Sequence, residues 1–168
     1  MTTKMFFTIL TSGLLFSIAG LSETVPNCLA GGQELLSNNA AVLGWKNSTN
    51  NQYRNRAHII GTLIKTYSDH TGHHHYSVLI GGNQNDTVEV IYNEDFGPVP
   101  QAAPGATIEA CGDYITSNNS AGHFPVSPDG ALVHWVHQSP HPESHDSGYL
   151  VMNGVVCGQQ ASAAGPKR

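Results

Sequence analysis

Charged side chains are scarce in this 168-residue chain, where Asp, Glu, Lys and Arg together make up 11% of the residues. Seven of these residues are basic and twelve are acidic, which gives a formal net charge of −5 at pH 7. A protein that binds nucleic acid needs a patch of Lys and Arg to neutralise phosphates. The composition therefore argues against nucleic acid as a partner, and the negative charge favours solubility.

Long apolar runs are missing as well. The longest one, residues 5–20, contains Thr and Ser and is shorter than the roughly 20 apolar residues that span a bilayer. It follows Lys4 and ends in small residues, which is the layout of a secretory signal peptide rather than of a membrane anchor. We predict a signal peptide over 1–19, with cleavage after Ala19 or as late as Ser22. The mature chain is then exported to the periplasm or the extracellular space and carries no membrane span.

Cysteine is rare, with three residues at Cys28, Cys111 and Cys157. In an exported chain three cysteines predict one disulfide and one remaining thiol. Cys111 and Cys157 lie in segments that we interpret as strands, whereas Cys28 lies near the mature N-terminus, where chains are usually mobile. These positions favour a Cys111–Cys157 disulfide. A bridge from Cys28 to either partner, and three buried thiols, are the alternatives.

Strand signals dominate what is present. Short segments rich in Val, Ile and Thr are separated by clusters of Gly, Pro, Asn and Asp, and Asn153-Gly154 between apolar pairs predicts a tight hairpin. Gly61 and Gly112 interrupt two of the strands, where they allow bends. We predict an all-β fold, a small OB-like barrel of five to six strands, because closure removes exposed strand edges. An open sandwich is the alternative. The predicted strands are 57–67, 75–80, 87–92, 106–115 and 131–137.

The expected domain organisation follows from these segments. Residues 20–55 form an N-terminal extension with a short helix or turn and a polar connector. The β-barrel domain covers 56–158, and residues 159–168 form a disordered tail.

Histidine is the residue type that stands out, because eight of the ten histidines lie in two short stretches, 70–75 and 134–145. Neutral imidazoles are the preferred ligands of Zn²⁺ and also bind Cu²⁺ and Ni²⁺. Pro140 turns the chain after the last strand, so the residues that follow can return to the end of that strand. We therefore predict that four ligands converge at one end of the barrel, with His141 pointing to solvent; the four are His75, His134, His137 and His145.

Each histidine also has a simpler interpretation, as a hydrogen-bonded or solvated side chain. The spacing of the second stretch matches no established zinc motif, and it is not His-Glu-x-x-His. Trp135 alone is typical of a core residue rather than a stacking surface.

Four segments carry a resemblance to a known family: GTLIKTYSDHTGHHHYSVLI (61–80), YNEDFGPVP (92–100), PGATIEACGDYITSN (104–118) and GALVHWVHQSPHPESHDSGYLVMNGVVCG (130–158). In this order they resemble a family of small exported bacterial proteins that is defined only as a domain of unknown function. The resemblance covers about residues 56–158, and its most specific part is the His-Trp-x-His-x-x-Pro segment at 134–140. Tyr92 stands where that family usually has His. The resemblance implies no established activity, but it implies a site made from matching positions, which are His75, Asn93, Asp95, His134, Trp135, His137, Pro140, His145 and Gly148.

The resemblance also bears on the cysteines. Cys111 and Cys157 stand at positions where the family tends to have aromatic residues, and a paired replacement implies contact between the two. This supports the Cys111–Cys157 disulfide.

Three functions fit these observations. The first is an exported binding module with a histidine-rich site for a small ligand or a transition metal, zinc or copper. The second is a metal-dependent hydrolase that uses the same histidines, with Asp95 or Glu143 as acid or base. The third is a structural protein that binds another envelope protein. Nucleophile-elbow and P-loop motifs are missing from the sequence, so a metal-activated water is the only catalytic route it supports.

Overall fold

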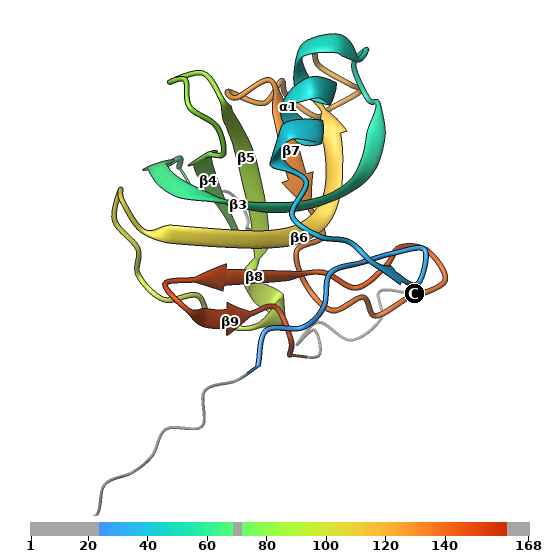
Figure 1. Cartoon of the computed structure of the whole chain (residues 1–168), viewed down its shortest axis with the longest axis vertical. Helices are drawn as coiled ribbons and strands as arrows, with labels where there is room; N and C mark the ends of the chain where they lie inside the picture. Colours follow the sequence, from blue (N-terminus) through green and yellow to red (C-terminus); the bar gives the residue numbers. More distant parts are fainter. Residues whose placement is uncertain (1–23, 69–71, 161–168) are drawn as a thin grey trace, which may run out of the picture.

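The computed structural model describes residues 24–68 and 72–160, so the predicted signal peptide and residues 161–168 of the predicted tail lie outside the described residues. The described chain contains a small hairpin, a helix, a barrel and a second hairpin (Figure 1). In chain order the elements are β1 Leu29–Ala30, β2 Gln33–Glu34, α1 Asn39–Ser48, β3 Arg54–Thr66, β4 His73–Leu79, β5 Thr87–Asn93, the 3₁₀ turn η1 Glu94–Phe96, β6 Thr107–Thr116, β7 Ala131–His134, β8 Tyr149–Met152 and β9 Val155–Cys157.

Five strands close the barrel in the order β3-β4-β5-β7-β6, and β6 pairs back to β3. The β5–β7 pair is parallel and the other pairs are antiparallel. This order is that of an OB barrel, so the predicted all-β, OB-like fold is confirmed. The β8–β9 hairpin extends the sheet from β6, and its turn is the predicted Asn153-Gly154, where both residues have positive φ.

Alternation along the strands separates core from surface. Val78, Val88, Val90, Ile108 and Val133 are fully buried in the barrel core, and their neighbours along each strand point to the other face of the sheet. On β4 and β5 that other face is also buried, because the loop at 117–130 covers it. The long strand β3 pairs with β6 through residues 54–62 and with β4 through 62–66, so it bends between two partners. Gly61 lies at this bend, and a Cβ there would be 2.3 Å from the carbonyl oxygen of Leu79. Glycine is therefore required where β3 and β4 approach closely.

Helix α1 covers one end of the barrel (Figure 1). Its Val42 is buried in the core, and the Trp45 ring packs against Tyr53 and Tyr114 with centroids 6.1 and 5.4 Å apart. Lys46 donates hydrogen bonds to the carbonyl oxygens of residues 85 and 87 at the start of β5. The starts of β5 and β7 thus lie at the helix end. The opposite end carries His134 at the end of β7 and His73 of β4, which pairs with Asn93 at the end of β5.

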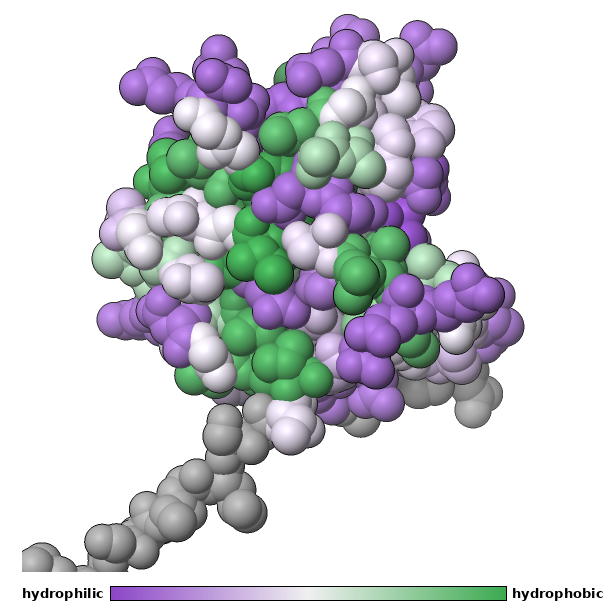
Figure 2. Space-filling view, in the orientation of Figure 1, coloured by the Kyte–Doolittle hydropathy of each residue, from purple (hydrophilic) through white to green (hydrophobic). Residues whose placement is uncertain are grey.

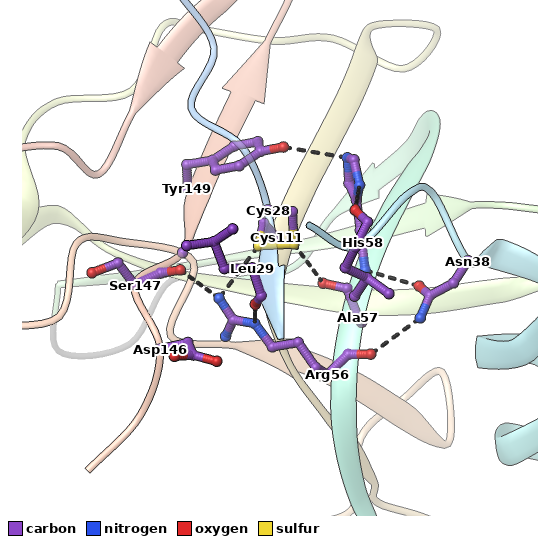
Figure 3. The surroundings of a disulfide bond; sticks show 12 residues. Cys28, Leu29, Asn38, Arg56, Ala57, His58, Cys111, Asp146, Ser147 and Tyr149 are labelled. Carbon is purple, nitrogen blue, oxygen red and sulfur yellow. Dashed lines mark hydrogen bonds between the residues drawn. A yellow bond between two sulfur atoms is a disulfide. The ribbon is translucent and has the colours of Figure 1, made fainter. Parts of the chain in front are cut away.

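The predicted Cys111–Cys157 disulfide is wrong. The disulfide joins Cys28 to Cys111, with Cα atoms 5.5 Å apart, and Cys157 is a buried thiol (Figure 3). Strand β8 lies between the strands of Cys111 and Cys157, which places these strands about 10 Å apart. In addition, Cys157 belongs to the barrel core, whereas Cys111 packs on the outer face. A bridge needs closer Cα atoms and converging Cβ directions.

The surface is mixed. On the face in Figure 2, hydrophobic residues are interspersed with hydrophilic ones. The most exposed large apolar side chains, Leu36, Phe124 and Val155, lie in three separate segments of the chain, two in connections and one at the start of β9. Within residues 24–68 and 72–160, no helix is long and apolar enough for a bilayer crossing.

Candidate functional site

A row of aromatic and imidazole rings lies at the end of the barrel opposite α1, and we call it the histidine rim. His73 at the start of β4 stacks on His134 at the end of β7, with ring centroids 6.2 Å apart. The ring of His134 lies next to that of Trp135, with centroids 4.6 Å apart, and the Trp135 ring lies next to that of His145, with centroids 5.7 Å apart. The rim thus joins two strands and the β7–β8 connection. Its members are His73, Phe96, His134, Trp135, His137 and His145.

His137 continues the row into the protein. Its ring is 5.9 Å from that of His145, at an angle of 87°. On its other side it stacks on Phe96 of η1, with centroids 3.5 Å apart and ring planes 9° apart. His137 is 7% exposed and Phe96 6%, so this end of the row is buried.

The backbone of Trp135 is strained. Its φ of 53° lies in the left-handed region, which is unfavourable for a bulky side chain. This conformation ends β7 three residues before the predicted end at His137. Gly148 and Gly158 leave room for this conformation. A Cβ on Gly148 would lie 2.4 Å from the carbonyl oxygen of Trp135, and a Cβ on Gly158 would lie 2.6 Å from that of Val136. Such strain persists where surrounding packing enforces it, and it is concentrated at functional sites.

Two rim histidines have a defined tautomer. The Nδ1 atom of His137 lies 2.9 Å from the carbonyl oxygen of Gln138, and Nδ1 of His145 lies 3.1 Å from that of Asp146. A carbonyl oxygen only accepts, so Nδ1 carries the proton in both rings and Nε2 carries the lone pair. The Ser139 hydroxyl lies 3.3 Å from Nε2 of His145, to which it can donate. Fixing Nδ1 in this way is how proteins orient imidazoles that ligate metals.

Burial, together with the smaller effects of the neighbouring His73, His137, His75 and His145, lowers the pKa of His134 to about 4. Burial also lowers the pKa of His137 and is the largest effect on it. The hydrogen bond from its ring to the Gln138 carbonyl oxygen acts in the opposite direction, because it favours the charged form. Both rings are therefore neutral at pH 7, the form that binds metals.

His75 is turned toward a buried carboxylate. Its Nδ1 lies 2.7 Å from Oε1 of Glu89, which is 4% exposed. Ser127 donates to the other oxygen of Glu89 at 2.6 Å. Glu89 was not recognised from the sequence, because its place in an alternating strand predicts a solvated side chain. Only the packing of the 117–130 loop onto β4 and β5 buries it.

The remaining predicted residues lie elsewhere. Asn93 accepts a hydrogen bond from the backbone N–H of Asp95 at 2.9 Å and so caps η1. His141 is an exposed side chain that pairs with Glu143 at 3.3 Å. His74 stacks between Tyr76 and Tyr92 and pairs with Glu94, beside an open pocket of about 410 Å³.

Within residues 24–68 and 72–160, no three His, Cys, Asp or Glu side chains are grouped closely enough to hold a metal ion as they stand. The rim offers imidazole pairs rather than a preassembled set of three. Comparisons of the chain with protein-family models, with curated proteins and with solved structures found no match.

Proposed function

We propose that this protein is a small exported binding module that takes up one transition-metal ion, Zn²⁺ or Cu²⁺, at the histidine rim. The observation that carries the proposal is the His137–His145 pair, whose Nδ1 atoms are held by carbonyl oxygens and whose rings lie 5.9 Å apart. Two imidazoles on one tetrahedral ion have centroids roughly 5 Å apart, given metal–nitrogen bonds of about 2.0–2.1 Å. The observed separation of the two rings is close to this value.

His134 and His73 are the candidates for further ligands. Their rings stack 6.2 Å apart at the same rim, and His134 is neutral at physiological pH. His145 lies on the connection between β7 and β8, outside regular secondary structure. Its side chain can rotate while its backbone stays in place, so we expect binding to draw the His145 ring toward the other rim histidines. The ligands of such a site come together when the metal ion binds.

The fold and the disulfide support the rest of the proposal. β4 and β5 are the second and third strands of the barrel, and OB barrels bind ligands on the corresponding face. The Cys28–Cys111 disulfide is compatible with an oxidising compartment. Of the two carboxylates that a hydrolase would use, Glu143 pairs with the exposed His141, and Asp95 is an exposed residue of η1.

Titration of untagged protein with Zn²⁺ and Cu²⁺ tests the proposal, with isothermal calorimetry as the measurement. We expect one ion per chain, binding weakened at least tenfold in His145→Gln, and unchanged binding in His141→Gln. His141 is the matched control because it lies on the same loop but is exposed. Absence of binding, or equal effects of the two changes, would favour a purely structural role for the rim.

A further inference from the structure

We infer that the N-terminal segment 28–35, which we call the clasp, positions His145 for the proposed metal site, with Asp146 and Arg56 as the positioning residues. The inference rests on the proposed function. It concerns a segment that the sequence led us to treat as an extension outside the barrel domain.

The clasp is fastened to the outer face of the barrel at both of its ends. Cys28 is joined to Cys111 of β6 by the disulfide and is 2% exposed. At the other end, the carbonyl oxygen of Leu35 accepts a hydrogen bond from Nδ1 of His58 on β3, at 2.8 Å. The Leu35 N–H also donates to the carbonyl oxygen of Cys28 at 2.7 Å, which closes the segment on itself. The clasp is therefore a rigid part of the barrel.

The tip of the clasp contacts the residue after His145. The N–H of Gly31 donates to Oδ2 of Asp146 at 2.8 Å, across 115 residues of sequence. The carbonyl oxygen of the same Asp146 accepts the Nδ1–H of His145. Asp146 thus binds the clasp through its side chain and the His145 imidazole through its backbone carbonyl. The clasp therefore influences where the His145 ring lies.

Arg56 makes the second connection. Its Nε donates to the carbonyl oxygen of Leu29 at 2.9 Å, and its Nη2 donates to the carbonyl oxygen of Ser147 (Figure 3). Its Nη1 pairs with Asp113 of β6 at 2.6 Å, and the guanidinium side chain is 9% exposed. Asp113 lies opposite His134 in the β6–β7 pair. One planar fork of donors therefore ties the clasp, the loop of His145 and the strand beside His134 together.

The loop is consequently held from two directions. Gly148 packs against the backbone of residues 111 and 135 on one side, and the clasp holds residues 146 and 147 on the other. His145 lies just before these contacts. Removing a group that orients a ligating imidazole typically reduces metal affinity ten- to hundredfold.

The test compares Asp146→Ala, Asp146→Asn and Glu143→Ala in the full untagged chain. Asn keeps a side-chain oxygen for the Gly31 N–H, and Glu143 is an exposed carboxylate of the same loop. We expect Asp146→Ala to weaken Zn²⁺ binding ten- to hundredfold, Asp146→Asn to restore most of it, and Glu143→Ala to match the native chain. Arg56→Lys, which keeps the charge but loses the planar fork, should weaken Zn²⁺ binding as well.

A second readout keeps this inference separate from the proposed function. Long-range nitrogen–proton NMR of the metal-free protein reports the ring of His145, with a protonated Nδ1 expected in the native chain. We expect Asp146→Ala to lose this signature and Glu143→Ala to keep it. If the native chain binds no Zn²⁺, the proposed function fails, and the imidazole signals still decide the positioning. If the native chain and Asp146→Ala bind Zn²⁺ equally and show the same His145 signals, the clasp does not position His145.

Discussion

Phe96 and His137 lie face to face, with ring centroids 3.5 Å apart, and this contact joins η1 to the segment after β7. Both rings are buried, so the stack carries packing energy as well as orienting His137. Replacing Phe96 by Ala should destabilise the protein by about 3 kcal/mol, because it removes a buried ring and leaves a cavity. Urea denaturation measures this change. Phe124→Ala is the control, since Phe124 is 64% exposed and should change stability by under about 0.5 kcal/mol.

Peptide mapping of the oxidised protein should recover Cys28 linked to Cys111, and Cys157 should react with thiol reagents only after unfolding, because it is 4% exposed. The bridge spans 83 residues, so the chain-entropy model gives about 4–5 kcal/mol of stabilisation. Replacing both linked cysteines by Ser should lower the urea midpoint accordingly. Recovery of Cys157 in the linked peptide would contradict the assignment.

Stability should fall as the pH falls from 6.5 to about 4, because the folded-state pKa of His134 lies below its ordinary value of 6.5. In this window the unfolded chain binds a proton at His134 that the folded chain excludes, so acid favours unfolding. The full contribution is about 3 kcal/mol, present above pH 6.5 and lost by about pH 4. Urea denaturation across this range measures it. His134→Gln should flatten the dependence and His123→Gln, at an exposed position, should not; equal curves for the two variants would refute the role of His134.

Gly112→Ala should severely destabilise the barrel, since the added Cβ would lie 2.4 Å from the carbonyl oxygen of His134 and 2.8 Å from a methyl group of Val136. The clash lies between β6 and β7, where backbone must move to relieve it. Gly44→Ala is the opposite case, because Gly44 lies inside α1 with nothing within 4 Å of the new Cβ. It should stabilise by about 0.5–1 kcal/mol through helix propensity. In thermal unfolding we expect a lower melting temperature for Gly112→Ala and a higher one for Gly44→Ala. A stable Gly112→Ala protein would show that β6 and β7 can separate there.

Local patterning was sufficient for the barrel. Alternation predicted strands at 87–92 and 106–115, and the structure has them at Thr87–Asn93 and Thr107–Thr116. The Asn153-Gly154 turn was correct for the same reason, since positive φ at two successive positions is a local property of those residues. The fifth strand was predicted to extend to residue 137 because no Gly, Pro, Asn or Asp interrupts 131–137. The left-handed turn at Trp135 is possible only because Gly148 and Gly158 leave room for its backbone, and they are distant in sequence.

The sequence by itself determined the strands, their turns and the gathering of histidines near strand ends, because each depends on neighbours within a few residues. Tertiary structure alone decided which rings meet. The His73 ring stacks on that of His134 although β5 separates their strands. His75 is instead held by Glu89, which becomes buried through a loop about 40 residues away. Tertiary structure also decided the disulfide. Cys28 reaches Cys111 because the clasp lies across β3 and β6, whereas strand β8 separates Cys111 from Cys157. Such pairings depend on strand order and on the face of the sheet, and no periodicity along the chain encodes either.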